Sequence, residues 1–176
     1  MKAYFYSFLF SIGIFASGFS QTYSTYQTTN GVQNISPSKI TTYNSNTNSY
    51  STYNTTNGIR DISPSSVTTY NSSTNSYSTY ETRNGIKNIS PSSVTTYNQN
   101  SNTYSTYETS NGIRNISPSR EIKENRDGSY DVYETKNGIR NISPSKVVKP
   151  NASGGYDVYE VKNGIRSISP SYRIKN

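Results

Sequence analysis

The stretch that decides the fold runs from Tyr77 to Thr103 and reads YSTYETRNGIKNISPSSVTTYNQNSNT. It is one of six near-copies that follow one another along the chain, and the Asn-Gly dipeptide inside them recurs at spacings of 27, 27, 27, 26 and 26 residues. Internal repetition of this kind decides an architecture before any other pattern does. We therefore treat residues 21–176 as a single repeat domain whose units span 23–49, 50–76, 77–103, 104–129, 130–155 and 156–176.

Each unit predicts a β-hairpin. Asn and Gly both tolerate the positive φ that tight hairpin turns require, and Asn84-Gly85 lies between two segments rich in β-forming residues. Pro91 ends the second arm because proline lacks a ladder donor, extended structure resumes at 94–97, and an Asn/Ser-rich loop leads to the next unit. The sequence thus predicts an all-β fold, an antiparallel β-hairpin repeat array forming an extended or curled meander.

A parallel β-solenoid with one repeat of 26 or 27 residues per coil is the alternative architecture. In such a solenoid the basic residue that follows each Asn-Gly turn would stack on its own copies at roughly 4.8 Å. Antiparallel hairpins about double that separation, so the charges favour the meander.

The register of the hairpin is predicted from two co-varying positions. An acid three residues before the Asn never occurs without a base two residues after the Gly. A three-residue loop, Arg83 to Gly85, would place Glu81 opposite Lys87 and put Tyr80, Thr82 and Ile86 on one face. The acids are Glu81, Glu108, Glu134 and Glu160; the bases are Arg60, Lys87, Arg114, Arg140 and Arg166.

The apolar composition of residues 21–176 is unusual. It consists of 22 Ile and Val, 16 Tyr and one Ala, about a quarter of the segment, where globular domains have nearer half. A large dry core is therefore not expected, and Tyr, with an apolar ring and a hydroxyl, is the best candidate for binding. The candidate binding surface comprises Tyr53, Tyr80, Tyr107, Tyr133, Tyr159, Arg60, Lys87, Arg114, Arg140 and Arg166.

We expect no enzyme. The chain has no Cys and no His, so the thiolate nucleophile, the commonest general base and the commonest metal ligand are all missing. An active site is a unique constellation, whereas six repeats supply equivalent positions. No catalytic, cofactor-binding or metal-binding residues are predicted.

The first twenty residues have the pattern of a signal peptide. Met1-Lys2 is followed by an apolar run to Phe15 and by small residues up to Ser20, which predicts cleavage between Ser20 and Gln21. Cleavage after Gly18 and an uncleaved anchor are the alternatives, but the apolar run is short against the roughly 20 residues that cross a bilayer. We expect a secreted or cell-surface protein with no membrane span once the signal is removed.

The net charge of the chain and the edges of the predicted array indicate which partners to expect. The net charge of +7 is mild, and export makes nucleic acid an unsuitable partner, so glycans or anionic cell-surface polymers are favoured. The charged residues of 120–176 suit a solubilising cap, whereas the N-terminal edge of the array has no such protection and invites edge-to-edge or fibrous self-association.

The predicted function is that of an exported, non-enzymatic repeat protein with a structural, adhesive or self-assembling role at the cell surface or in extracellular matrix. Many linked weak sites gain apparent affinity by acting together. The alternative is a secreted carbohydrate-binding module that uses the exposed Tyr and Arg/Lys side chains. A weaker alternative is an ice-binding β protein with rows of Thr.

Overall fold

The computed structural model describes residues 21–176. The predicted signal peptide, which ends at Ser20, lies outside the described residues. The described chain forms eighteen strands and no helix. All strand pairs are antiparallel, which confirms the hairpin meander; the parallel solenoid is wrong.

Every unit contributes three strands. A first arm of seven or eight residues leads into the Asn-Gly turn: β1 (Thr22–Thr29), β4 (Ser49–Thr56), β7 (Ser76–Arg83), β10 (Thr103–Ser110), β13 (Tyr130–Lys136) and β16 (Tyr156–Lys162). A two-residue strand follows the turn: β2 (Val32–Gln33), β5 (Ile59–Arg60), β8 (Ile86–Lys87), β11 (Ile113–Arg114), β14 (Ile139–Arg140) and β17 (Ile165–Arg166). A return strand follows the Ser-Pro-Ser loop: β3 (Lys39–Asn44), β6 (Ser66–Asn71), β9 (Ser93–Asn98), β12 (Arg120–Glu124), β15 (Lys146–Pro150) and β18 (Tyr172–Lys175).

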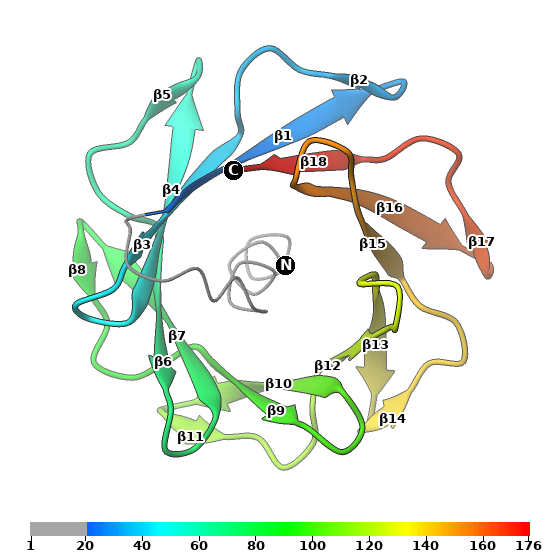
Figure 1. Cartoon of the computed structure of the whole chain (residues 1–176). Coiled ribbons are helices and arrows are strands. Elements are labelled where there is room, and N and C mark those ends of the chain that lie inside the picture. The colour runs from blue at the N-terminus through cyan, green and yellow to red at the C-terminus, as the bar shows by residue number, and fades with distance from the viewer. Residues whose placement is uncertain (1–20) are drawn as a thin grey trace.

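First arms and return strands alternate around a closed barrel of twelve strands (Figure 1). Closure is made by the two ends of the chain, because β1 pairs with β18 from Ser24 opposite Lys175 to Gln27 opposite Tyr172. The expectation of an unprotected N-terminal edge is therefore wrong. The edge of β1 is covered by the last strand of the same chain, which removes the premise for edge-to-edge association.

The closing seam repeats the contact that joins one unit to the next. The Thr28 hydroxyl donates to the carbonyl of Pro170, and the Thr28 amide donates to that of Ser171 at 3.0 Å. Between the second and third units, Thr82 makes the same two bonds to Pro64 and Ser65, the second at 3.2 Å. The sixth unit thus meets the first through the same two bonds that join the third unit to the second.

The Asn-Gly turn has two residues, not three. Asn84 and Gly85 both have positive φ, 51° and 79°, the combination of a type I′ turn, whose twist matches that of the flanking strands. Thr82 then pairs with Lys87. The predicted Glu81–Lys87 pairing is wrong, because the shorter turn puts these two side chains on opposite faces and moves Ile86 away from Tyr80 and Thr82.

The buried interior is organised as a belt to which each barrel strand gives one residue. All twelve are buried. Hydroxyls face each other in three hairpins of the threonine part, with Oγ1 to Oγ1 distances of 3.0, 3.0 and 2.9 Å. The belt comprises Thr25, Thr41, Thr52, Thr68, Thr79, Thr95 and Thr106, then Ile122, Val132, Val148, Val158 and Ile174.

A layer of tyrosines lies two residues from the belt, on the side of the Asn/Ser-rich loops. Ring centroids of Tyr70 and Tyr77 are 4.7 Å apart, and those of Tyr97 and Tyr104 are 4.4 Å apart. Burial, and then the neighbouring phenols, raise the pKa of Tyr50 to about 12 and that of Tyr77 further. The layer includes the first tyrosine of every unit: Tyr23, Tyr50, Tyr77, Tyr104, Tyr130 and Tyr156.

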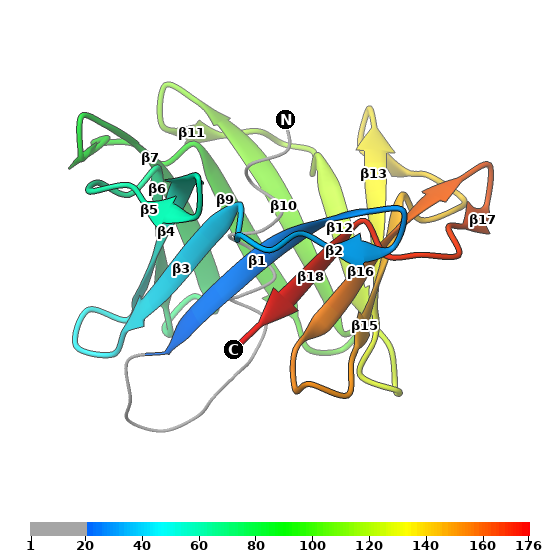
Figure 2. The ribbon, with the colours of Figure 1, turned by 90° about the horizontal axis from the view of Figure 1, so that it is seen from above.

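The two ends of the barrel differ. All first arms run in the same direction, so the six Asn-Gly turns gather at one end and the five loops that join successive units, which are rich in Asn and Ser or contain Asp-Gly, gather at the other (Figure 2). At the turn end each unit folds outward as a flap (Figure 1). We define the flaps as residues 29–36, 56–63, 83–90, 110–117, 136–143 and 162–169, and call the six together the crown.

Candidate functional site

The structure brings together the predicted tyrosines and cations of each unit on the outer wall. The Lys87 Nζ lies 4.2 Å from the centroid of the Tyr80 ring, and the Arg114 Cζ lies 4.4 Å from that of Tyr107. The other pairs have distances of 4.4 to 4.6 Å: Arg60 with Tyr53, Arg140 with Tyr133, and Arg166 with Tyr159. The first unit has Gln33 in place of a cation, and there Lys175 lies 5.6 Å from the Tyr26 ring.

The two-residue turn explains these stacks. It pairs the cation with a residue two positions after the tyrosine, as Arg114 pairs with Thr109, so cation and ring share the outer face. The guanidinium covers the ring and remains exposed to solvent. Such cation–π contacts contribute about 0.5–1 kcal/mol at exposed sites.

The acids that recur three residues before the Asn of the turn face the other way, into the barrel mouth below the crown. Glu134 pairs in register with Arg120, with Nε and Oε1 3.7 Å apart, and Glu160 forms an ion pair with Lys146. Glu81 and Glu108 pair in register with Ser66 and Ser93. Each of these partners comes from a return strand rather than from the flap, so the acids belong to the barrel wall.

Sequence reasoning missed the aliphatic side chains of the flaps. Each flap carries two, and the second of each pair is 99–101% exposed, while the first is 71–75% exposed. Single exposed aliphatic residues are ordinary, but twelve of them at six equivalent places make the flaps a candidate interaction surface. They are Val32, Ile35, Ile59, Ile62, Ile86, Ile89, Ile113, Ile116, Ile139, Ile142, Ile165 and Ile168.

The flaps are held in defined positions. A Cβ built on Gly85 would lie 2.7 Å from the Ser63 Oγ of the preceding flap, so the turn glycine packs directly on the neighbouring unit. The same approach joins Gly31 to Ser169 across the closing seam. The exposed aliphatic side chains are therefore mounted on an anchored frame.

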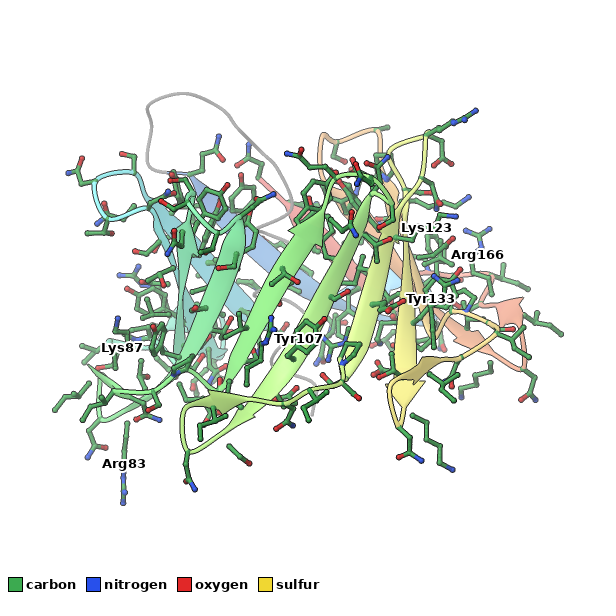
Figure 3. All side chains as sticks on the ribbon, turned by 90° about the horizontal axis from the view of Figure 1, so that it is seen from below. Arg83, Lys87, Tyr107, Lys123, Tyr133 and Arg166 are labelled. Atoms are coloured by element: carbon green, nitrogen blue, oxygen red, sulfur yellow. The ribbon has the colours of Figure 1, made fainter. Side chains whose placement is uncertain are left out.

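Positive charge is segregated to the crown. The flaps hold eight Lys and Arg and one acid, Asp61, which gives them a formal charge of +7. The remaining described residues hold eight bases and nine acids, a net charge of −1. Figure 3 shows Arg83 and Lys87 at the flap end and Lys123 toward the opposite end. The crown cations are Arg60, Arg83, Lys87, Arg114, Lys136, Arg140, Lys162 and Arg166.

Two hollows accompany these surfaces. An open one in the fifth flap is lined by Lys136, Asn137, Ile139, Arg140, Asn141 and Ile142. The other, of about 280 Å³, lies at the loop end and is lined by Tyr70, Ser72, Asn75, Tyr77, Tyr97, Gln99 and Tyr104. The first combines apolar and cationic groups, and the second combines aromatic and amide groups.

No protein-family model matches the chain, and no curated protein matches it either. Within residues 21–176, no cluster of three Asp or Glu side chains is placed to hold a metal ion. The same described segment contains no helix long and apolar enough to cross a membrane. Fold and surface define a closed β-barrel of six hairpin repeats with a cationic, aliphatic crown.

Proposed function

We propose that this chain is an exported, non-enzymatic adhesive protein of the cell surface or extracellular matrix, which binds by presenting its six flaps together. The observation that carries the proposal is the exposure of two aliphatic side chains in every flap, at one end of one closed barrel. Side chains that folding leaves in water at six equivalent places serve contacts outside the chain.

The closed barrel supports binding by avidity. Five flaps each offer two aliphatic side chains and one or two cations, and the first offers two aliphatic side chains and no cation, so a single flap is a weak site. Linked weak sites gain roughly 10²–10⁴ in apparent affinity when they engage one surface simultaneously. Because the inter-unit bonds fix the flaps relative to one another, the loss of conformational freedom on binding is small.

The test is retention of the segment Gln21–Asn176 on carboxylated polystyrene beads, an anionic and apolar surface. Variants would carry Ile→Ser at the second aliphatic position of one, two and four flaps, beginning with Ile89→Ser. We expect retention to fall steeply and non-linearly, about tenfold or more between two and four altered flaps. Equal retention across the series, or no retention of the parent protein, contradicts the proposal.

A carbohydrate-binding module is the second candidate, favoured by the five cation–tyrosine stacks on the outer wall. It predicts retention on heparin beads that the combined variant Tyr80→Ala/Tyr107→Ala weakens and the flap variants leave unchanged. Ice binding has less support, because the seven threonines of the belt are buried rather than displayed.

A further inference from the structure

We propose that the surface bound by the crown is an anionic phospholipid bilayer, with the second aliphatic residue of each flap inserted among the headgroups and the flap cations paired with lipid phosphates. The inference rests on the proposed adhesive role of the crown and names its partner.

The aliphatic side chains determine the kind of partner. Ile62, Ile89, Ile116 and Ile142 are 99–101% exposed and lack a hydroxyl or a ring, so a polysaccharide would gain little from them. The boundary between headgroups and acyl chains accepts such side chains, and binding there grows with the apolar area buried. Six pairs of aliphatic residues at one end of a barrel provide that area in one event.

The charge of the crown determines the kind of lipid. The flaps carry +7 and the rest of the described chain −1, so the molecule has one positive end. Each Lys or Arg close to an anionic leaflet strengthens binding about fivefold. The stacked cations are suited to this, because the Arg114 guanidinium lies over the Tyr107 ring on one side while the Arg114 side chain remains exposed to solvent.

The same charge disfavours a second copy as the occupant. Two crowns placed face to face would each bring +7, and like charges that meet at an interface repel. An anionic polymer would engage the cations and leave the isoleucines in water. Only a partner that offers negative charge and an apolar region side by side contacts both the flap cations and the exposed isoleucines.

The test is co-sedimentation of the segment Gln21–Asn176 with phosphatidylcholine vesicles made with and without phosphatidylglycerol. We expect binding only to the phosphatidylglycerol vesicles. The variant Ile62→Ser/Ile89→Ser/Ile116→Ser/Ile142→Ser should lose about 100-fold in partitioning, and Arg60→Gln/Arg114→Gln about 20-fold. All six side chains are exposed, so the circular dichroism spectra and unfolding midpoints should stay close to those of the parent.

The matched control removes two charges from the opposite end. Lys123 and Arg126 are exposed and lie outside the crown, so Lys123→Gln/Arg126→Gln should leave vesicle binding within about twofold of the parent. An equal loss in this control and in Arg60→Gln/Arg114→Gln would mean attraction by net charge alone and would overturn the proposal.

The remaining outcomes are also decisive. Vesicle binding that survives the isoleucine substitutions and is abolished by heparin would identify an anionic polymer as the partner and overturn the lipid proposal. Flap-dependent retention on carboxylated beads without vesicle binding would overturn this inference and leave the adhesive function standing. Loss of both would remove the adhesive function as well.

Discussion

Isoleucine occupies two opposite environments in this protein. In the belt, Ile122 and Ile174 are 0% and 2% exposed, whereas in the flaps Ile62 and Ile89 are 99% and 101% exposed. The belt isoleucines stabilise the barrel, since full burial of such a side chain contributes about 1.5–3 kcal/mol. The flap isoleucines contribute nothing comparable to folding, so the isoleucines that stabilise the barrel and those that we propose to bind form separate sets.

The belt itself has two halves built on one register. The seven positions from Thr25 to Thr106 carry threonines, six of which form three pairs that face each other hydroxyl to hydroxyl. The five positions from Ile122 to Ile174 carry aliphatic residues. A hydroxyl pair contributes about 0.5–1.5 kcal/mol net. The later units therefore supply more of the stability of the ring than the earlier ones.

Alkaline pH should unfold the barrel by ionising its buried tyrosines, whereas the aliphatic side chains of the flaps carry no group that titrates. Burial raises the pKa of Tyr23 and Tyr50 to about 12, and raises those of Tyr77, Tyr104 and Tyr130 further. A pKa that is higher in the folded state means stability that is complete below pH 10, the value of a free phenol, and lost as pH rises toward 12 and beyond. Circular dichroism and tyrosinate absorbance should report one cooperative transition in that range. A gradual titration without unfolding would contradict the buried tyrosine layer.

The two isoleucine environments are compared directly by two identical substitutions. Ile122→Ala removes buried methyl groups and should lower the free energy of unfolding by about 2–5 kcal/mol. Ile62→Ala should change it by less than about 0.5 kcal/mol. Urea denaturation of both variants measures the difference. Similar losses in the two would show that the flap packs on the barrel.

Anchoring of the flaps is tested at two glycines that share a positive φ. Gly85, with φ 79°, approaches the Ser63 Oγ, whereas Gly154, with φ 77°, has no neighbour within 4 Å of a built Cβ. Gly85→Ala should lower the free energy of unfolding by about 2–4 kcal/mol, the cost of backbone strain plus a clash. Gly154→Ala should cost only about 1–2 kcal/mol, from the backbone alone. Equal thermal midpoints would exclude the contact between flaps.

The threonine and aliphatic parts of the belt are compared by replacing one buried hydroxyl pair with valines. Thr68→Val leaves the buried Thr79 hydroxyl without its 3.0 Å partner and should cost about 1–3 kcal/mol. The double variant Thr68→Val/Thr79→Val converts this pair to the aliphatic pattern of Val148 and Val158, and should return to within about 1 kcal/mol of the parent. Additive losses in a double-mutant cycle would show that the hydroxyls do not act as a pair.

The hairpin, the unit boundaries and the fold class could be predicted because Asn84-Gly85 and Pro91 act locally. The loop length could not be predicted, because Asn-Gly occurs in both two-residue and three-residue turns. The co-variation of the Glu and the base was misleading, because the two residues have separate partners on opposite faces of the sheet. Glu134 meets Arg120 of the preceding unit, a contact that no spacing within one unit reveals. Closure depends on how six units turn about an axis, a property that emerges from strand twist and tilt.

The exposed aliphatic residues of the crown could have been recognised from a pattern in the sequence. An aliphatic residue follows each Asn-Gly, and Ile recurs three residues later, before Ser-Pro, in all six copies. A two-residue strand followed by a proline loop is too short to bury both. The predicted three-residue loop instead placed Ile86 on a sheet face with Tyr80 and Thr82, and it gave no sign that threonines fill seven of the twelve belt positions.

A cross-link across the seam tests whether the two ends of the chain join to close the ring. Ser24 in β1 lies opposite Lys175 in β18, and the chain has no native cysteine. The double variant Ser24→Cys/Lys175→Cys should form an intramolecular disulfide on mild oxidation, with the thiols consumed and the protein monomeric on non-reducing electrophoresis, while Ser24→Cys/Lys149→Cys should not. Free thiols, or disulfides found only between molecules, would show an open array and contradict the ring.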